Sequence, residues 1–408
     1  MKRVVVTGMS CITALGHNWQ DFSANLKKGQ NAVIHMPQWD RFEMLNTRLA
    51  APIMDFKKPA HYKRKQVRAM GRVSLMATRA TELALEQAGL LDHPALTDGS
   101  TGIAYGSSTG SPDPIKAFGN MLENGDMSGV TATTYIQMMA HTTPVNVGLF
   151  FGLKGRVITT SSACTSASQG IGYAYEAIKF GQQKLMVAGG AEELCATEAA
   201  VFDTLYATST KNSTPELTPR PYDKNRDGLV LGEGAGTLIL EELEHAQARG
   251  ATIYAEIIGF GTNSDGQHVT RPTSATMQKA MELALAEANI PASEIKYVNG
   301  HGTATESGDL AESIATNAAM GKNVAMSSLK SYLGHTLGAC GAIEAWACIE
   351  MMRNNWFSPT VNLTDIDPGM GELDYITGQG REINTEYVMS NNFAFGGINT
   401  SLIFKRWT

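Results

Sequence analysis

Val157-Ile158-Thr159-Thr160-Ser161-Ser162-Ala163-Cys164-Thr165-Ser166 is the stretch that decides the fold. It opens with β-branched residues, which favour a buried strand, and continues to Phe180 with the small and apolar residues of a buried helix. Cys164 therefore lies where a strand ends and a helix begins. Backbone N–H groups there are unpaired and the helix dipole favours negative charge. We therefore expect an easily ionised thiol beside amides that can hold an oxyanion.

The same succession of strand, loop and helix recurs on both sides of this stretch. Short apolar runs end in Gly, Ser or Thr, and the segments Gln66–Gln87 and Thr276–Ala288 have the apolar spacing of helices. This alternation is typical of an α/β fold on mainly parallel sheets. The predicted strands are Val4–Val6, Ile103–Tyr105, Val157–Thr159, Leu185–Val187, Tyr297–Val298 and Val324–Met326.

Two internal similarities predict that the chain consists of related halves. Gly232–Leu240 resembles Gly396–Phe404, and Val157–Cys164 with its helix resembles Val324–Lys330 followed by the predicted helix Gly338–Glu350. We expect an N-terminal half, residues 1–250, and a C-terminal half, residues 251–408.

Composition excludes several classes of protein. The chain has 408 residues, of which 43% are hydrophobic and 18% charged, so it can bury a large core and is neither fibrous nor disordered. A net charge of −6 argues against nucleic acid as the main ligand. No uncharged apolar stretch approaches the ~20 residues that cross a bilayer, and Met1–Val6 reads as the start of a strand rather than a signal peptide.

The five cysteines have no CxxC pair and no short regular spacing. This pattern fits neither a disulfide scaffold nor a zinc site and favours a reduced, cytoplasmic location. We expect Cys164 to be functional and the others to be buried and inert.

Two histidines occupy loops equivalent to that of Cys164. His301 follows the strand at Tyr297–Val298, and His335 follows the strand at Val324–Met326. Loops at the carboxyl ends of parallel strands line one crevice, so we expect the three side chains to meet. A Cys-His hydrolase needs a base, whereas two imidazole donors suit a site that holds a thioester oxygen while an enolate forms. Lys330 would add positive charge near His335, with Asp309 and Glu344 to balance it.

The chain resembles the β-ketoacyl-acyl carrier protein synthases, the condensing enzymes of the thiolase superfamily, and particularly the elongating fatty-acid type. The resemblance runs almost end to end. It rests on the motifs Ser162–Ser166, Arg220–Gly228, His301–Asp309, Lys330–His335 and Asn391–Gly397. It implies an α/β, thiolase-like five-layer αβαβα fold built from two related halves.

The resemblance also implies a decarboxylative Claisen condensation in fatty-acid or specialised, polyketide-like chain elongation. Cys164 would carry the acyl group, while His301 and His335, with Lys330 nearby, would polarise the malonyl thioester. The amides of Cys164 and Phe395 would hold the oxyanion, and no metal or organic cofactor would be needed.

Further residues take their roles from the same resemblance. Phe395 would be a gate, with Gly396 and Gly397 giving its loop the freedom to move, and Phe202 would pack against it. Thr303 and Thr305 would contact the pantetheine arm of the substrate. Thr109 would line the acyl tunnel. Its small polar side chain there argues against an ordinary saturated fatty acid as the substrate.

The expected partner is an acyl carrier protein, in its acyl- and malonyl-loaded forms, and the expected assembly is a homodimer or a heterodimer with a related subunit. Carrier proteins are acidic, so a basic surface would attract them. Arg64, Arg68 and Arg72 have the spacing of one helical stripe, and Lys65 lies beside it.

Parts of the sequence resemble three other kinds of protein. Asp223–Gly228 begins like a calcium loop, but its twelfth position is Gly234 where a Glu is needed. A Rossmann-type NADPH-dependent reductase would use Tyr175 and Lys179 in catalysis. However, the branched side chain of Ile12 would obstruct the close approach of the cofactor's pyrophosphate to the turn after Gly8.

A non-catalytic chain-length partner subunit would lack the nucleophile that this sequence has.

Overall fold

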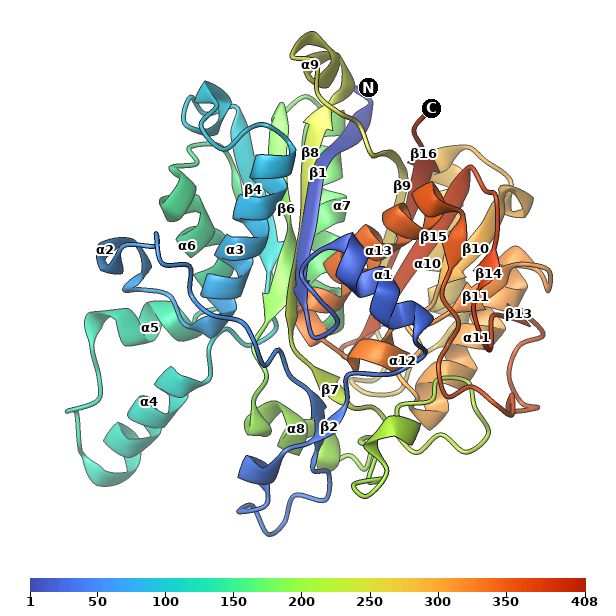
Figure 1. Cartoon of the computed structure of the whole chain (residues 1–408), viewed down its shortest axis with the longest axis horizontal. Coiled ribbons are helices and arrows are strands. Elements are labelled where there is room, and N and C mark those ends of the chain that lie inside the picture. The colour runs from blue at the N-terminus through green and yellow to red at the C-terminus, as the bar shows by residue number, and fades with distance from the viewer.

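The computed structural model describes residues 1–408 and contains one mixed sheet of eleven strands (Figure 1). The strands of its first half are β1 (Val4–Thr13), β4 (Thr101–Gly106), β5 (Val157–Thr160), β6 (Leu185–Glu192) and β8 (Gly234–Glu242). Those of the second half are β9 (Ala255–Ser264), β10 (Ile295–Asn299), β11 (Ala325–Ser327), β15 (Tyr387–Ala394) and β16 (Ile398–Arg406), with β13 (Asp374–Tyr375) added at the edge.

The two halves have the same topology. From the shared β1–β9 contact outward, the strand order is β1-β8-β6-β4-β5 on one side and β9-β16-β15-β10-β11 on the other. The directions also agree, since β8 and β16 run antiparallel to both their neighbours while the next three strands of each half are parallel. The segments that resemble each other in sequence form equivalent strands, β8 with β16 and β5 with β11. The prediction that the fold consists of two related halves is therefore confirmed at the level of topology.

Helices form three layers around the two halves of the sheet, one between the halves and one on the outer face of each. Helices α7 (Ser166–Lys179) and α13 (Cys340–Asn354) lie between the halves and share one large apolar core with both of them (Figure 1). Helix α3 (Arg72–Gln87) covers the outer face of the first half, and α10 (Ser274–Ala288) with α11 (Glu306–Met320) covers that of the second. The result is the expected five-layer αβαβα arrangement.

Equivalent glycines let the outer helices approach the sheet in both halves. A Cβ added to Gly8 would lie 2.2 Å from the Ala84 carbonyl oxygen of α3, and one added to Gly259 would lie 2.4 Å from the Ala284 carbonyl oxygen of α10. Both distances are too short for any side chain, so each position requires glycine.

The remaining elements surround this frame. The other helices are α1 (Trp19–Lys27), α2 (Arg64–Val67), α4 (Asp113–Asn124), α5 (Ala132–Met138), α6 (Thr142–Phe151), α8 (Ala196–Asp203), α9 (Leu243–Ala248) and α12 (Lys330–Leu333). Two small sheets consist of β2 (Ile34–His35), β3 (Leu49–Ala51) and β7 (Leu231–Gly232), and of β12 (Trp356–Phe357) with β14 (Arg381–Glu382). None of the helices has the length and apolar character needed to span a membrane.

The helix predicted from Gln66 to Gln87 is interrupted, which corrects the sequence interpretation. Helix α2 ends at Val67 and α3 begins at Arg72. Gly71, between them, lies against Ser111, where an added Cβ would be 1.9 Å from Ser111 Oγ. This close tertiary contact turns the chain, so Arg64, Arg68 and Arg72 do not form a stripe on one helix.

Candidate active site

Cys164 occupies the turn between β5 and α7. The turn is a short 3-10 helix, Ala163–Thr165, in which Ala163 has a φ of 51°, a left-handed conformation that is unfavourable for a residue with a Cβ. This strained turn leaves Cys164 buried at the start of α7.

His335 contacts the cysteine directly. Its Nε2 lies 3.0 Å from Cys164 Sγ, and its Nδ1 accepts a hydrogen bond of 3.3 Å from the Leu337 backbone N–H. A neutral imidazole whose Nδ1 is an acceptor carries its proton on Nε2. Burial and the charge of Lys330 place the pKa of His335 well below its usual value, so the ring is neutral. His335 is therefore a hydrogen-bond donor toward the sulfur.

His301 completes the group. Its ring stands nearly perpendicular to that of His335, with ring centroids 5.0 Å apart, and nitrogen and sulfur atoms of His301, His335 and Cys164 lie within 4.8 Å of one another. Burial, Lys330 and His335 hold the pKa of His301 well below its usual value. The structure thus brings three residues from three strand ends into one place, as the topology predicted.

The backbone of His301 is fixed by a residue that the sequence interpretation did not identify. Glu312, on α11, accepts hydrogen bonds from the His301 N–H at 2.5 Å and the Gly302 N–H at 2.7 Å, and from the Tyr222 hydroxyl at 3.0 Å. The only sequence signal is the spacing of Asp309 and Glu312, which places both carboxylates on one helix face.

Lys330 is buried and forms an ion pair with Glu344, as expected, at 2.5 Å. Burial alone would lower the pKa of Lys330, but the Glu344 carboxylate raises it above its usual value, so the charge is retained. The second oxygen of Glu344 accepts a hydrogen bond from Asn392 Nδ2 at 2.7 Å. A permanent positive charge therefore lies beside both histidines.

Asp309 does not balance Lys330, contrary to expectation. Its carboxylate accepts hydrogen bonds from the backbone N–H groups of Thr303 at 3.0 Å, Ala304 at 3.1 Å and Tyr222 at 2.8 Å. A carboxylate already bound to three amides is not free to pair with the lysine. Asp309 instead fixes the loop that carries His301.

The expectation of an easily ionised Cys164 is wrong in this structure. Burial raises the pKa of the Cys164 thiol to about 11, although the charge of Lys330 and the backbone amides of Phe395 and Cys164 lower it. The enclosed position outweighs the favourable amides, because a thiolate there loses its hydration.

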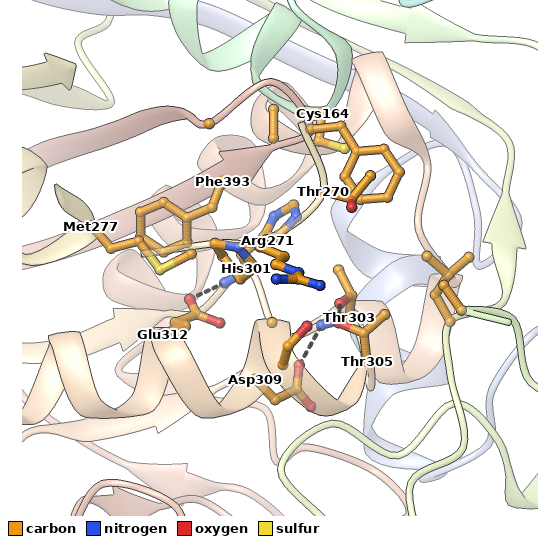
Figure 2. Close-up of a pocket in the computed structure, with 18 of the residues that line it drawn as sticks. Cys164, Thr270, Arg271, Met277, His301, Thr303, Thr305, Asp309, Glu312 and Phe393 are labelled. Carbon is orange, nitrogen blue, oxygen red and sulfur yellow. Dashed lines mark hydrogen bonds between the residues drawn. The ribbon is translucent and has the colours of Figure 1, made fainter. Parts of the chain in front are cut away.

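A cavity of about 280 Å³ surrounds the three residues (Figure 2). Thr303 and Thr305 line it, with their hydroxyl oxygens 2.9 Å apart. The rings of Phe202 and Phe395 lie 5.1 Å apart in the same cavity, and Gly396 and Gly397 have φ values of 87° and 73°. Phe395 thus stands on a glycine-supported turn beside the sulfur.

Thr109 lies outside this cavity on an exposed turn. Its hydroxyl donates a hydrogen bond of 2.8 Å to Glu198, a buried residue of α8. Burial and the neighbouring Glu192 raise the pKa of Glu198 well above its usual value. Ala199 and Phe202 of the same helix pack in one apolar cluster with Cys164.

The basic residues are divided between two environments. Arg64, Lys65 and Arg68 are exposed. Arg72 is bound through two nitrogens to Glu233, at 2.5 and 2.9 Å, and donates to the Ile53 carbonyl at 2.8 Å. Arg72 is therefore part of the internal structure, and only the other three form an accessible basic surface.

Comparison with known proteins gives full-length matches. The family model described as "Beta-ketoacyl synthase, N-terminal domain" matches residues 1–246, and the one described as "Beta-ketoacyl synthase, C-terminal domain" matches residues 254–364. The chain is 37% identical to 3-oxoacyl-[acyl-carrier-protein] synthase 2 of Vibrio harveyi, over 99% of both chains.

Solved structures are also similar over their whole length. A β-ketoacyl synthase from Burkholderia phymatum STM815 has a TM-score of 0.99 at 63% identity, with 100% of each chain covered. The ishigamide ketosynthase/chain length factor has a TM-score of 0.90 at 29% identity, again with 100% of each chain covered.

Proposed function

This chain belongs to the β-ketoacyl synthase family, and from that premise we propose that it joins an acyl group, held as a thioester on Cys164, to malonyl-acyl carrier protein. The products are 3-oxoacyl-acyl carrier protein and CO2. The observation that carries the proposal is the 3.0 Å contact of Cys164 Sγ with a neutral, proton-donating His335 in a cavity shared with His301.

The first half-reaction loads the enzyme. Cys164 Sγ attacks the carbonyl carbon of an acyl carrier thioester, and the amides of Cys164 and Phe395 stabilise the oxyanion. The carrier thiolate leaves and takes up the proton lost by Cys164. Both amides already lower the pKa of the thiol, which supports their orientation toward the reacting sulfur.

The second half-reaction forms the new carbon–carbon bond. The Nε2–H group of His335 and the ring N–H group of His301 bind the thioester oxygen of the malonyl group, and negative charge builds on that oxygen as CO2 leaves. The enolate carbon then attacks the acyl carbonyl carbon, and the C–S bond to Cys164 breaks. The expelled thiolate takes its proton from water. Burial and the charge of Lys330 keep both histidines neutral, so they bind this charge as donors without transferring a proton.

The alternatives receive less support from the structure. A hydrolase needs an imidazole base toward the thiol, whereas His335 presents a proton there. For the reductase, Lys179 Nζ bonds to the Tyr175 hydroxyl at 2.9 Å and to Glu287 at 2.5 Å, and none of these residues lines the cavity. A non-catalytic partner subunit has no need of the complete Cys-His-His group.

We also propose the assembly and substrate range. The enzyme works in the cytoplasm, as a homodimer or paired with a related synthase-like subunit, and Arg64, Lys65 and Arg68 attract an acidic carrier protein. The halves meet at residue 250. Glu198, one turn from Phe202 on α8, and its partner Thr109 would form the end of the acyl compartment. A polar end favours short or oxygenated acyl chains in a fatty-acid or specialised pathway.

The proposal is tested with acyl carrier thioesters of graded length and unsaturation, each mixed with malonyl carrier protein and analysed by mass spectrometry. We expect a product two carbons longer than the acyl donor, with a 3-oxo group, and no product from Cys164→Ala. A wild-type protein that loads no acyl group onto Cys164 and releases no CO2 would rule the proposal out.

A further inference from the structure

Arg271 is a cation at the active-site cavity with no partner. It lies between β9 and α10, lines the same cavity as His301, Thr303 and Thr305, and is exposed. Figure 2 shows its guanidinium extending toward the side of the cavity formed by the two threonines. The structure contains no ion pair and no hydrogen bond from this side chain, although guanidinium has five N–H donors.

The carboxylates of the cavity are already engaged. Asp265 accepts hydrogen bonds from the Thr273 N–H at 3.2 Å and Asn399 Nδ2 at 2.8 Å, while Asp309 and Glu312 bind the backbone of the His301 loop. Arg271 is therefore the one charged side chain of the lining that no protein group satisfies.

The segment that carries Arg271 is held in place. The Asp265 N–H donates to the Gly397 carbonyl at 2.8 Å, and the Gly396 N–H donates to the Val269 carbonyl at 2.8 Å. Both bonds connect the segment to the turn that carries Phe395. The backbone that carries Arg271 is thus fixed beside the turn of Phe395, which lines the same cavity as Cys164.

The charge of Arg271 lies on the solvent side of the cavity. Arg271 is exposed, whereas Cys164, His301 and His335, which line the same cavity, are buried. We therefore place Arg271 at the mouth of the cavity.

The chemistry of the proposed substrates limits what such a cation can bind. The malonyl carboxylate loses its charge as CO2, so a cation paired with it would stabilise the ground state more than the transition state. The phosphodiester of the carrier's pantetheine arm keeps its charge throughout, and guanidinium binds phosphate oxygens in a bidentate way.

We propose that Arg271 binds the phosphate of the pantetheine arm and so positions both thioester substrates at the mouth of the cavity. This inference rests on the proposed function. It adds a phosphate-binding residue to the two threonines already expected to contact the arm.

The test compares thioesters that differ only in this phosphate. Malonyl-phosphopantetheine and malonyl-pantetheine are condensed with acyl-loaded enzyme, and hexanoyl-phosphopantetheine and hexanoyl-pantetheine are used to load Cys164. We expect wild-type kcat/KM to favour each phosphorylated substrate by about 10- to 100-fold. Arg271→Gln should remove this preference mainly through KM and leave the unphosphorylated substrates unchanged.

Lys322→Gln is the matched control, because Lys322 is an exposed cation whose nearest carboxylate is that of Glu372, outside the cavity. An equal loss with phosphorylated and unphosphorylated substrates overturns the inference. A loss confined to malonyl substrates, with or without phosphate, also overturns it and assigns Arg271 to the carboxylate. If wild-type enzyme condenses neither of these thioesters nor malonyl-acyl carrier protein, the proposed function itself has failed; if it condenses only the carrier-bound substrate, the comparison is repeated with carrier protein bearing each form of the arm, and an unchanged preference in Arg271→Gln overturns the inference.

Discussion

His335 directs a proton at Cys164, because its Nδ1 accepts the Leu337 N–H while its Nε2 lies 3.0 Å from the sulfur. Burial and the charge of Lys330 lower the pKa of His335 and so keep the ring neutral. A base in this position would need an unprotonated Nε2. The orientation of one backbone amide therefore decides that the imidazole stabilises negative charge and does not remove the thiol proton.

Replacing His335 or His301 by alanine should separate the two half-reactions. Loss of one oxyanion donor typically lowers the rate by about 10²–10³-fold, so CO2 release from malonyl carrier protein should fall by this amount. Acylation of Cys164, followed by intact-protein mass spectrometry, should continue. If the His335→Ala enzyme loads no acyl group yet folds normally, the imidazole acts as a base and the assignment is wrong.

The buried thiol should react slowly at neutral pH. Since the Cys164 pKa is raised to about 11 and only the thiolate reacts, alkylation by iodoacetamide should increase about tenfold for each pH unit between 7 and 9. The measurement needs a Cys195→Ser background, because Cys195 is the one cysteine that is not buried.

Lys330→Met should slow this alkylation further at each pH, since the lysine charge lowers the thiol pKa. Lys405→Met, which removes a half-buried cation near the end of β16 that is paired with Glu386, is the control. A rate that levels off below pH 8 in the unmodified background would contradict the raised pKa.

The sequence predicted the arrangement of this site better than its electrostatics. Strand ends and repeated segments placed Cys164, His301 and His335 together, because the carboxyl ends of parallel strands share one edge. The ionisation of Cys164 was misjudged because the depth of burial depends on tertiary packing. Glu312 was missed for a related reason, since it acts on backbone amides that no side-chain pattern records.

Breaking the Lys330–Glu344 pair should destabilise the protein strongly. Both side chains are buried, and removing one member of a buried pair commonly costs about 3–5 kcal/mol. We expect Glu344→Gln to lower the free energy of unfolding in urea by that amount, whereas Glu372→Gln, at the exposed pair with Lys322, should change it by less than about 1 kcal/mol.

A double variant separates pairing from packing. Lys330→Met with Glu344→Leu removes both charges together, so it should recover much of the stability lost in Glu344→Gln. Activity should not return, because the histidines lose the neighbouring charge. A double variant as unstable as the single one would show that the polar contacts of Glu344 with Asn392 matter more than the ion pair.

Glu198 should limit the acyl chains that the enzyme accepts. The carboxyl group of Glu198 accepts a hydrogen bond from the Thr109 hydroxyl. Burial and the neighbouring Glu192 raise the pKa of Glu198, so it retains a proton more readily than an exposed glutamate. It lies one helical turn from Phe202, on the same face of α8. An apolar acyl chain that reaches Glu198 would keep water away from the polar Glu198–Thr109 pair, which costs binding free energy.

Glu198→Leu should therefore shift the preference of Cys164 loading toward longer saturated chains. Each added methylene in an apolar pocket is worth about 10-fold or more in specificity, so the ratio of decanoyl to butanoyl loading should rise by at least about tenfold, measured with the two carrier thioesters in competition. Glu86→Leu, at an exposed position of α3, should leave the ratio as it is in the unmodified protein. An unchanged ratio in Glu198→Leu would place the end of the acyl chain elsewhere, because an apolar residue at a true contact point cannot leave the relative binding of long and short chains unaffected.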